Sequence, residues 1–116
     1  MPGEIVYLNN RADFIEYLKK NKNVIVKFTA TWCGPCKIAK PIVDNYFQQC
    51  KSYLNMIIVD ADKGSNLCSY LKVKAFPTLY SFVNSQIAES VVGSEEKDIL
   101  SFFKATMQKI TTQVAN

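Results

Sequence analysis

The sequence predicts an α/β fold, in which a central mixed five-stranded sheet is flanked by four helices. Two patterns support this prediction. In the first half of the chain, apolar strand-like runs alternate with helical patterns, and connections of that length join parallel strands. In the second half, two β-rich runs precede a final amphipathic helix. The chain has 116 residues and is 48% hydrophobic and 21% charged, so we expect one globular domain over residues 1–116.

The first half is expected to fold in the order strand, helix, strand, helix, strand. Asn10 is placed to cap the first helix. The central strand is apolar on both faces except at Lys27, which indicates burial on both sides. The second helix keeps its apolar period beyond Pro41, so we expect this proline to kink the helix and not to end it. The expected elements are residues 5–8, 11–20, 24–29, 34–51 and 56–60.

The second half is expected to form a short helix, a hairpin and a last helix. The hairpin loop, residues 84–86, lacks the glycine that is usual in tight turns. Ser94 is placed to cap the last helix, with Glu95 and Glu96 in its first turn. The expected elements are residues 66–71, 78–83 and 88–92 and a helix that begins after Ser94.

Composition excludes several classes of protein. The chain has no histidine, which excludes Cys–His proteases, Ser–His–Asp hydrolases and histidine-based zinc sites. Its net charge of +4 comes from dispersed lysines. The densest group, Lys19, Lys20 and Lys22, has no aromatic or arginine-rich neighbours, so we expect a solvated helix end and no nucleic-acid partner.

No part of the sequence predicts membrane attachment or export. No apolar run approaches membrane-spanning length, and no leader pattern precedes the first strand. We therefore expect a cytoplasmic protein with no membrane partner. We also expect a monomer.

The segment Trp32-Cys33-Gly34-Pro35-Cys36 lies between the central strand and the long helix. Residues three apart on a helix have Cβ atoms about 5–6 Å apart, close to disulfide range. A helix N-terminus favours a thiolate in its first turn, and a proline suits that turn because it has no N–H to leave unpaired. The spacing predicts a reversible dithiol.

A metal site is the competing interpretation of two cysteines at this spacing. Zinc needs two further ligands. Cys50 and Cys68 form no second pair of this kind, and no histidine could complete the set. We therefore expect redox chemistry and no bound metal. For Cys50 and Cys68 we expect buried structural thiols, with a regulatory or intermolecular disulfide as the alternative.

Further motifs stand at fixed places along the chain. Pro41 lies inside the long helix, Asp60 and Asp62 end a strand, Phe76-Pro77-Thr78 enters the next strand, and Gly93 precedes the last helix. Together with the Cys33–Cys36 segment, they resemble the thioredoxin family over nearly the full length of the chain. The resemblance implies the thioredoxin fold, reduction of disulfides in other proteins, and recharging by a thioredoxin reductase. It implies no bound cofactor, because NADPH is used only through that reductase.

The resemblance also implies roles for the dithiol segment. Cys33 would be the exposed nucleophile that forms a mixed disulfide, and Cys36, more buried, would resolve it. Gly34 and Pro35 would favour the reduced form. Trp32 would lie beside the dithiol as a contact face for substrate, where the alternative is an ordinary core aromatic.

Two segments distant in the sequence would complete the substrate-binding surface. By resemblance, the Phe76–Pro77 bond is cis and faces the dithiol. The backbone before the proline would then pair with an incoming peptide in the manner of an added strand. Gly93 would border the substrate groove, unless it only marks a turn.

Lys27 departs from the family pattern, which has a buried aspartate at this strand position and often a lysine where this chain has Ile58. Three interpretations are open. Lys27 reaches the surface by its long stem, it pairs with Asp60, or it tunes the dithiol. In the last case a charged Lys27 would favour the Cys36 thiolate, whereas a neutral Lys27 could accept its proton.

Two alternatives to a reductase also follow from the sequence. A relative altered at Lys27 could act as an oxidase or isomerase. A thioredoxin-fold binding subunit would depend on its partner contacts and would retain its function without the two active cysteines.

Overall fold

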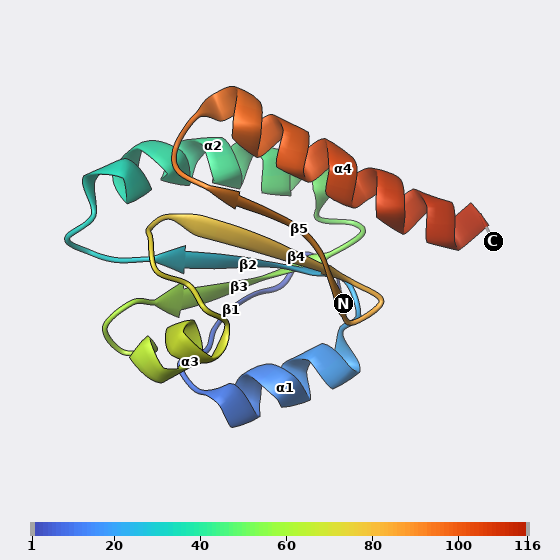
Figure 1. The fold of residues 1–116 in the computed structure, drawn as a ribbon. Helices are drawn as coiled ribbons and strands as arrows, with labels where there is room; N and C mark the ends of the chain where they lie inside the picture. Colours follow the sequence, from blue (N-terminus) through green and yellow to red (C-terminus); the bar gives the residue numbers. More distant parts are fainter. Residues whose placement is uncertain (1, 116) are drawn as a thin grey trace.

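The computed structural model describes the backbone of residues 2–115 and the side chains through residue 112. Over these residues, one sheet carries helices on both faces (Figure 1). The sheet order is β1-β3-β2-β4-β5; β3 is parallel to β1 and β2, and β4 is antiparallel to β2 and β5. The elements are β1 (Ile5–Tyr7), α1 (Arg11–Lys20), β2 (Val24–Thr29), α2 (Gly34–Cys50), β3 (Asn55–Asp60), α3 (Ser65–Tyr70), β4 (Thr78–Val83), β5 (Gln86–Val92) and α4 (Glu96–Ala115). The predicted mixed five-stranded sheet with four helices is confirmed.

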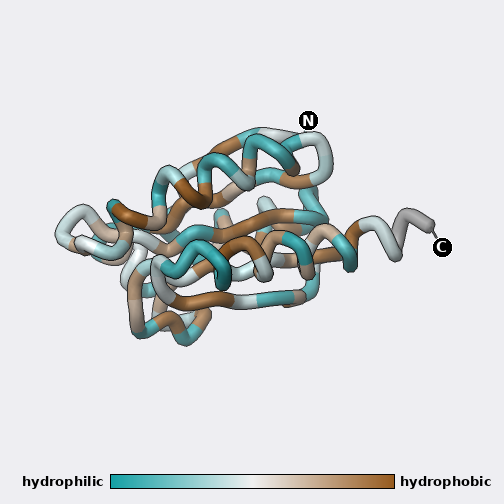
Figure 2. The backbone as a smooth tube through the Cα atoms, turned by 90° about the horizontal axis from the view of Figure 1, so that it is seen from above, coloured by the Kyte–Doolittle hydropathy of each residue, from teal (hydrophilic) through white to brown (hydrophobic). Residues whose placement is uncertain are grey.

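The sheet separates two apolar cores. Helices α2 and α4 lie on one face, and α1 and α3 lie on the other (Figure 1). In Figure 2, apolar colour runs along much of the strands, whereas the helices alternate between polar and apolar residues. Side chains of β2 divide between the two faces, since Ile25 packs in the α2 and α4 core and Val26 and Phe28 pack in the other. Lys27 alternates with Val26 and Phe28, so it points to the α2 face.

Two sequence features of the helices behave as expected. The side chain of Asn10 accepts a hydrogen bond from the Asp13 N–H at 2.9 Å and caps α1. Pro41 lies inside α2, which continues to Cys50. The expectation that Pro41 does not end the helix is therefore confirmed, because the apolar face of α2 packs on the sheet on both sides of the proline.

The hairpin differs from its predicted form. Strand β5 begins at Gln86, so the loop has only two residues, Asn84 and Ser85, with φ values of 56° and 64°. Glycine usually supplies this left-handed backbone. Here tertiary hydrogen bonds hold the turn: the Ser85 N–H donates to the Lys22 carbonyl at 2.9 Å, and the Asn84 N–H donates to the Asn23 side chain at 3.0 Å.

The start of the last helix also differs. Helix α4 begins at Glu96, and the Ile99 N–H donates to the Glu95 carbonyl at 3.1 Å. Glu95 thus occupies the cap position, one residue later than a Ser94 cap would give. The prediction for Ser94 was wrong because Gly93 and Ser94 still belong to the turn after β5.

Candidate active site

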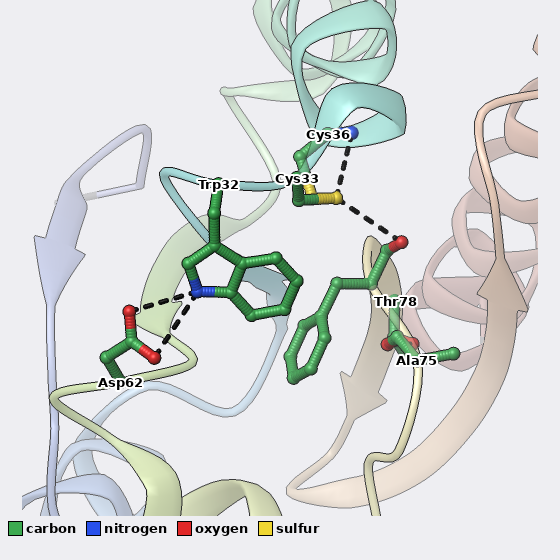
Figure 3. The surroundings of a disulfide bond; sticks show 7 residues. Trp32, Cys33, Cys36, Asp62, Ala75 and Thr78 are labelled. Carbon is green, nitrogen blue, oxygen red and sulfur yellow. Dashed lines mark hydrogen bonds between the residues drawn. A yellow bond between two sulfur atoms is a disulfide. The ribbon is translucent and has the colours of Figure 1, made fainter.

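The two cysteines of the Trp32-Cys33-Gly34-Pro35-Cys36 segment form a disulfide at the start of α2, with their Cα atoms 5.3 Å apart (Figure 3). Cys33 is the N-cap residue, with an extended backbone, and Cys36 lies within the first turn of the helix. The Cys36 N–H donates to the Cys33 Sγ at 3.2 Å. A helix N-terminus has unpaired N–H groups and partial positive charge, so Cys33 holds its sulfur where a thiolate is stabilised.

Both cysteines are buried in this disulfide form. Cys33 is 5% exposed and Cys36 is 6% exposed. They pack with Ala30, Ala61 and Phe76. The expectation that Cys33 is exposed and Cys36 more deeply buried was therefore wrong for the oxidised state, because each side chain covers the other and Phe76 closes over both.

The segment before β4 faces the disulfide through its backbone. The Phe76–Pro77 peptide bond is cis, as predicted. The Phe76 carbonyl oxygen lies 3.4 Å from the Cys33 Sγ, a contact drawn as a dashed line in Figure 3. A disulfide sulfur has no proton to donate, so this contact becomes an S–H···O hydrogen bond only in the dithiol.

Neighbouring hydrogen bonds fix this segment. The Thr78 hydroxyl donates to the Ala75 carbonyl at 2.7 Å (Figure 3). The Gly93 N–H donates to the Pro77 carbonyl at 2.9 Å, with Gly93 at a φ of 107° that favours glycine. Gly93 therefore lies beside the Phe76–Pro77 segment.

Trp32 lies on the surface next to the dithiol and is not a core aromatic. It is 63% exposed, and its ring meets the Phe76 ring edge to face with centroids 5.9 Å apart. The Trp32 Nε1–H donates to the Asp62 carboxylate, with distances of 3.1 and 3.3 Å to the two oxygens (Figure 3). The sequence places Asp62 only at the end of a strand and does not predict its contact with Trp32. We call the surface formed by Trp32, Phe76, Pro77 and Gly93 the aromatic side of the disulfide.

Lys27 is buried on the opposite side, and two of its predicted surroundings were wrong. Its side chain is 8% exposed, so it does not reach the surface, and its ammonium lies 3.9 Å from Asp44 and does not pair with Asp60. Asp60 instead accepts the backbone N–H groups of Asp62 and Lys63. The other Asp44 oxygen accepts a hydrogen bond from Lys40 at 2.7 Å.

The pKa of Lys27 depends on its burial and on two charged side chains of α2. Burial lowers the pKa of Lys27 from 10.5, Asp44 opposes that shift, and Lys40 adds to it. Asp44 lies two helical turns beyond Cys36 and seventeen residues beyond Lys27 in the sequence. Only the packing of α2 on the sheet brings it to Lys27, so no local pattern could have predicted the pair.

A groove of about 660 Å³ runs between α2 and the β1, β3 and β2 strands. Lys27 and Cys36 both line it, so the groove reaches the dithiol from the side opposite Phe76. We call it the lysine groove. Its lining includes Tyr7, Lys27, Cys36, Lys40, Asp44 and Ile58.

The two remaining cysteines lie away from the disulfide. Cys68 is buried in the core under α3, as expected. Cys50, also expected to be buried, is only half-buried, because it lies at the end of α2 at the margin of the other core. Burial raises the pKa of both thiols. Neither forms a disulfide within the described part of the chain.

Among the side chains that the structure describes, through residue 112, no cluster of three or more cysteine or acidic groups is arranged to hold a metal ion. Over residues 2–115, no helix is long and apolar enough to span a lipid bilayer.

The sequence of this chain is similar to those of known proteins. A family model described as Thioredoxin matches residues 5–106. The chain belongs to the thioredoxin family. It is 33% identical over 94 residues to a thioredoxin of Mycoplasmoides gallisepticum, covering 81% of this chain and 93% of that protein. It is also 30% identical over 98 residues to a bifunctional thioredoxin reductase/thioredoxin of Mycobacterium leprae, covering 84% of this chain and 21% of that protein.

Solved thioredoxin structures share the fold. The crystal structure of oxidised mitochondrial thioredoxin 3 from Saccharomyces cerevisiae superposes with a TM-score of 0.78 at 26% identity, covering 86% of this chain and 93% of that chain. Family membership and the Cys33–Cys36 disulfide make this chain a thiol–disulfide oxidoreductase that reduces protein disulfides.

Proposed function

We propose that Cys33 is the attacking thiol and Cys36 the resolving thiol of this reductase. The observation that carries the assignment is the hydrogen bond from the Cys36 N–H to the Cys33 Sγ at the N-cap of α2. That donor and the partial charge of the helix stabilise a thiolate at Cys33. The Cys36 sulfur is not at the N-cap position.

The reaction then proceeds by two exchanges. The Cys33 thiolate attacks one sulfur of a substrate disulfide; the substrate S–S bond breaks, and the departing thiolate takes up a proton. Cys36 loses its proton and attacks the Cys33 sulfur of the mixed disulfide, which releases the second substrate thiol. Two electrons pass to the substrate, and the Cys33–Cys36 disulfide forms again.

We propose that the aromatic side receives the substrate. The Phe76 backbone next to the cis bond would pair with an extended peptide, which recognises main-chain groups and so accepts many sequences. Exposed Trp32 would cover the peptide beside the scissile disulfide, and Gly93 leaves room for it, since a Cβ at this position would meet no atom within 4 Å.

We propose that a thioredoxin reductase, drawing on NADPH, returns the disulfide to the dithiol. The fused reductase and thioredoxin of Mycobacterium leprae supports this partnership. We further propose that the chain works as a monomer in the cytoplasm, as one domain over residues 1–116. Cytosolic thiols are kept reduced, in agreement with two cysteines that form no disulfide in the described structure.

The decisive experiment is reduction of insulin disulfides with NADPH and a thioredoxin reductase. We expect NADPH oxidation that depends on this protein, on the reductase and on insulin. Cys33→Ser and Cys36→Ser should abolish it, whereas Cys50→Ser, a matched change at a half-buried thiol away from the site, should retain it. Absence of turnover in the wild type would contradict the proposal and favour a binding subunit, and a strongly oxidising potential would favour an oxidase or isomerase.

We propose that Lys27 tunes the second exchange. A charged ammonium in the lysine groove would favour the Cys36 thiolate by Coulomb attraction in a poorly hydrated region. Lys27→Met should then slow release of the mixed disulfide and shift its pH profile to higher pH, and Lys27→Asp should do so more strongly. An unchanged pH profile for Lys27→Met would exclude this role.

A further inference from the structure

The lysine groove holds more positive charge than its own acidic side chains neutralise. Asp44 is engaged by Lys40, and Asp60 accepts two backbone N–H groups at 2.9 Å. Neither aspartate therefore makes a hydrogen bond to the buried Lys27. The charged side chains that line the groove are Lys27, Lys37, Lys40, Lys63, Asp44 and Asp60.

Lys27 is the buried lysine of this set, whereas Lys37, Lys40 and Lys63 are exposed. Its ammonium has three donors, yet its carboxylate partner Asp44 lies 3.9 Å away, too far for a hydrogen bond. A buried charge without close partners is unfavourable, and burial accordingly lowers the pKa of Lys27. A hydrogen-bond acceptor that entered the groove could supply the close contact to the Lys27 ammonium that Asp44 does not make.

The floor of the groove is apolar and open. The register of β1, β3 and β2 places Tyr7, Ile58 and Lys27 in one row across the sheet. Tyr7 is 73% exposed at the outer end of this row, and Lys27 is buried at the inner end. The groove volume of about 660 Å³ lies within the range of small-molecule sites. Its shape is thus an apolar channel that ends at an ammonium group.

We propose that the lysine groove binds a small carboxylate with an apolar body. The carboxylate pairs with Lys27 and Lys40, and the apolar body lies on Tyr7 and Ile58. Charge complementarity selects an anion over a neutral molecule of the same shape. The site goes beyond the proposed function, which needs no ligand here, and places its occupant next to Cys36 on the side away from the substrate.

The test is titration of the oxidised protein with phenylacetate, followed by amide NMR. We expect saturable shifts of the Lys27, Lys40 and Ile58 amides. Phenylacetamide, the neutral analogue of equal shape, should bind at least about tenfold more weakly, because hydrogen bonds between charged groups are the strong ones.

Two variants with opposite expected signs locate the carboxylate. Lys27→Met should weaken phenylacetate binding at least about tenfold, whereas Lys19→Met, which removes the same charge from an exposed site on α1, should change it less than about twofold because of salt screening. Asp44→Asn should tighten binding several-fold, since it removes the competing carboxylate. Glu16→Gln, on exposed α1, is its matched control.

The outcomes separate clearly. Absence of saturable groove shifts, equal binding of phenylacetamide, unchanged binding by Lys27→Met or weaker binding by Asp44→Asn would each overturn the proposal. Asp44→Asn leaves Lys27 in place, so the test holds even where Lys27→Met fails to fold. Failure here leaves insulin reduction intact, whereas failure of the proposed function leaves phenylacetate binding intact.

Discussion

The aromatic side and the lysine groove flank the same disulfide with different chemistry. On the aromatic side, the polar contacts near the sulfurs come from backbone groups of Phe76, Pro77 and Gly93. On the groove side, a buried ammonium depends on Asp44 of a different element. The comparison indicates that the aromatic side presents neutral main-chain groups to the sulfurs, whereas the electrostatics behind Cys36 depend on charged side chains.

The largest expected effect distinguishes the roles of the two cysteines. Cys36→Ser should trap a mixed disulfide with an insulin chain through Cys33, because no second thiol is left to release it, and turnover should fall at least about a thousandfold. Intact-mass spectrometry without reductant detects the adduct. Cys33→Ser should give no adduct; an adduct through Cys36 in that variant would contradict the assignment of Cys33 as the attacking thiol.

Gly93→Ala should destabilise the protein by straining the backbone on the aromatic side. At a φ of 107°, a side chain is strained, and such strain costs about 1–3 kcal/mol. We expect the free energy of unfolding in urea to fall by that amount. Gly34→Ala is the matched control, since its Cβ would meet no atom within 4 Å and it should stabilise the protein by about 0.4–1 kcal/mol. Equal effects of the two changes would refute the strain argument.

Lys27→Met should stabilise the groove side. The change removes the desolvation penalty of a buried ammonium, and Asp44, which is part-exposed, keeps Lys40 as its partner, so we expect a net gain in stability of about 1 kcal/mol or more. The wild type binds fewer protons folded than unfolded between the lowered pKa of Lys27 and 10.5. Its free energy of unfolding therefore rises with pH across this window.

The Lys27→Met variant should lack this rise. Urea unfolding at a series of alkaline pH values measures both curves. A wild type and variant that remain parallel across the window would show that Lys27 is not the group that titrates.

Asp62→Ala should have the smallest effect, on the aromatic side. It removes an exposed hydrogen bond of about 0.5–1 kcal/mol, equivalent to about two- to fivefold in kcat/KM for insulin reduction. Trp32 is the only tryptophan, so its fluorescence anisotropy reports its mobility directly and should fall. Glu16→Ala, an exposed acid on α1, should change neither quantity. Unaltered anisotropy in Asp62→Ala would mean that Phe76 alone holds the ring.

The sequence predicted what short-range chemistry decides. Asn10 caps α1 through its own side chain, and the dithiol segment meets the N-terminus of α2 because Cys33 directly precedes it. Apart from the start of α4, what it missed depends on contacts between distant residues. Asn84 and Ser85 adopt left-handed backbone because the end of α1 and the segment after it bond to them, and Asp44 faces Lys27 only once α2 packs on the sheet.

Burial of the disulfide limits which thiols can reduce it. With Cys33 and Cys36 both about nine-tenths or more covered, a low-mass thiol that collides at random finds little sulfur to attack, because attack needs in-line access to one sulfur. A protein reductant that docks on Trp32 and Phe76 can displace their side chains and open that path. We expect the oxidised protein to react slowly with the abundant small thiols of the cell. It should be reduced mainly by a partner protein that binds over the disulfide and exposes it.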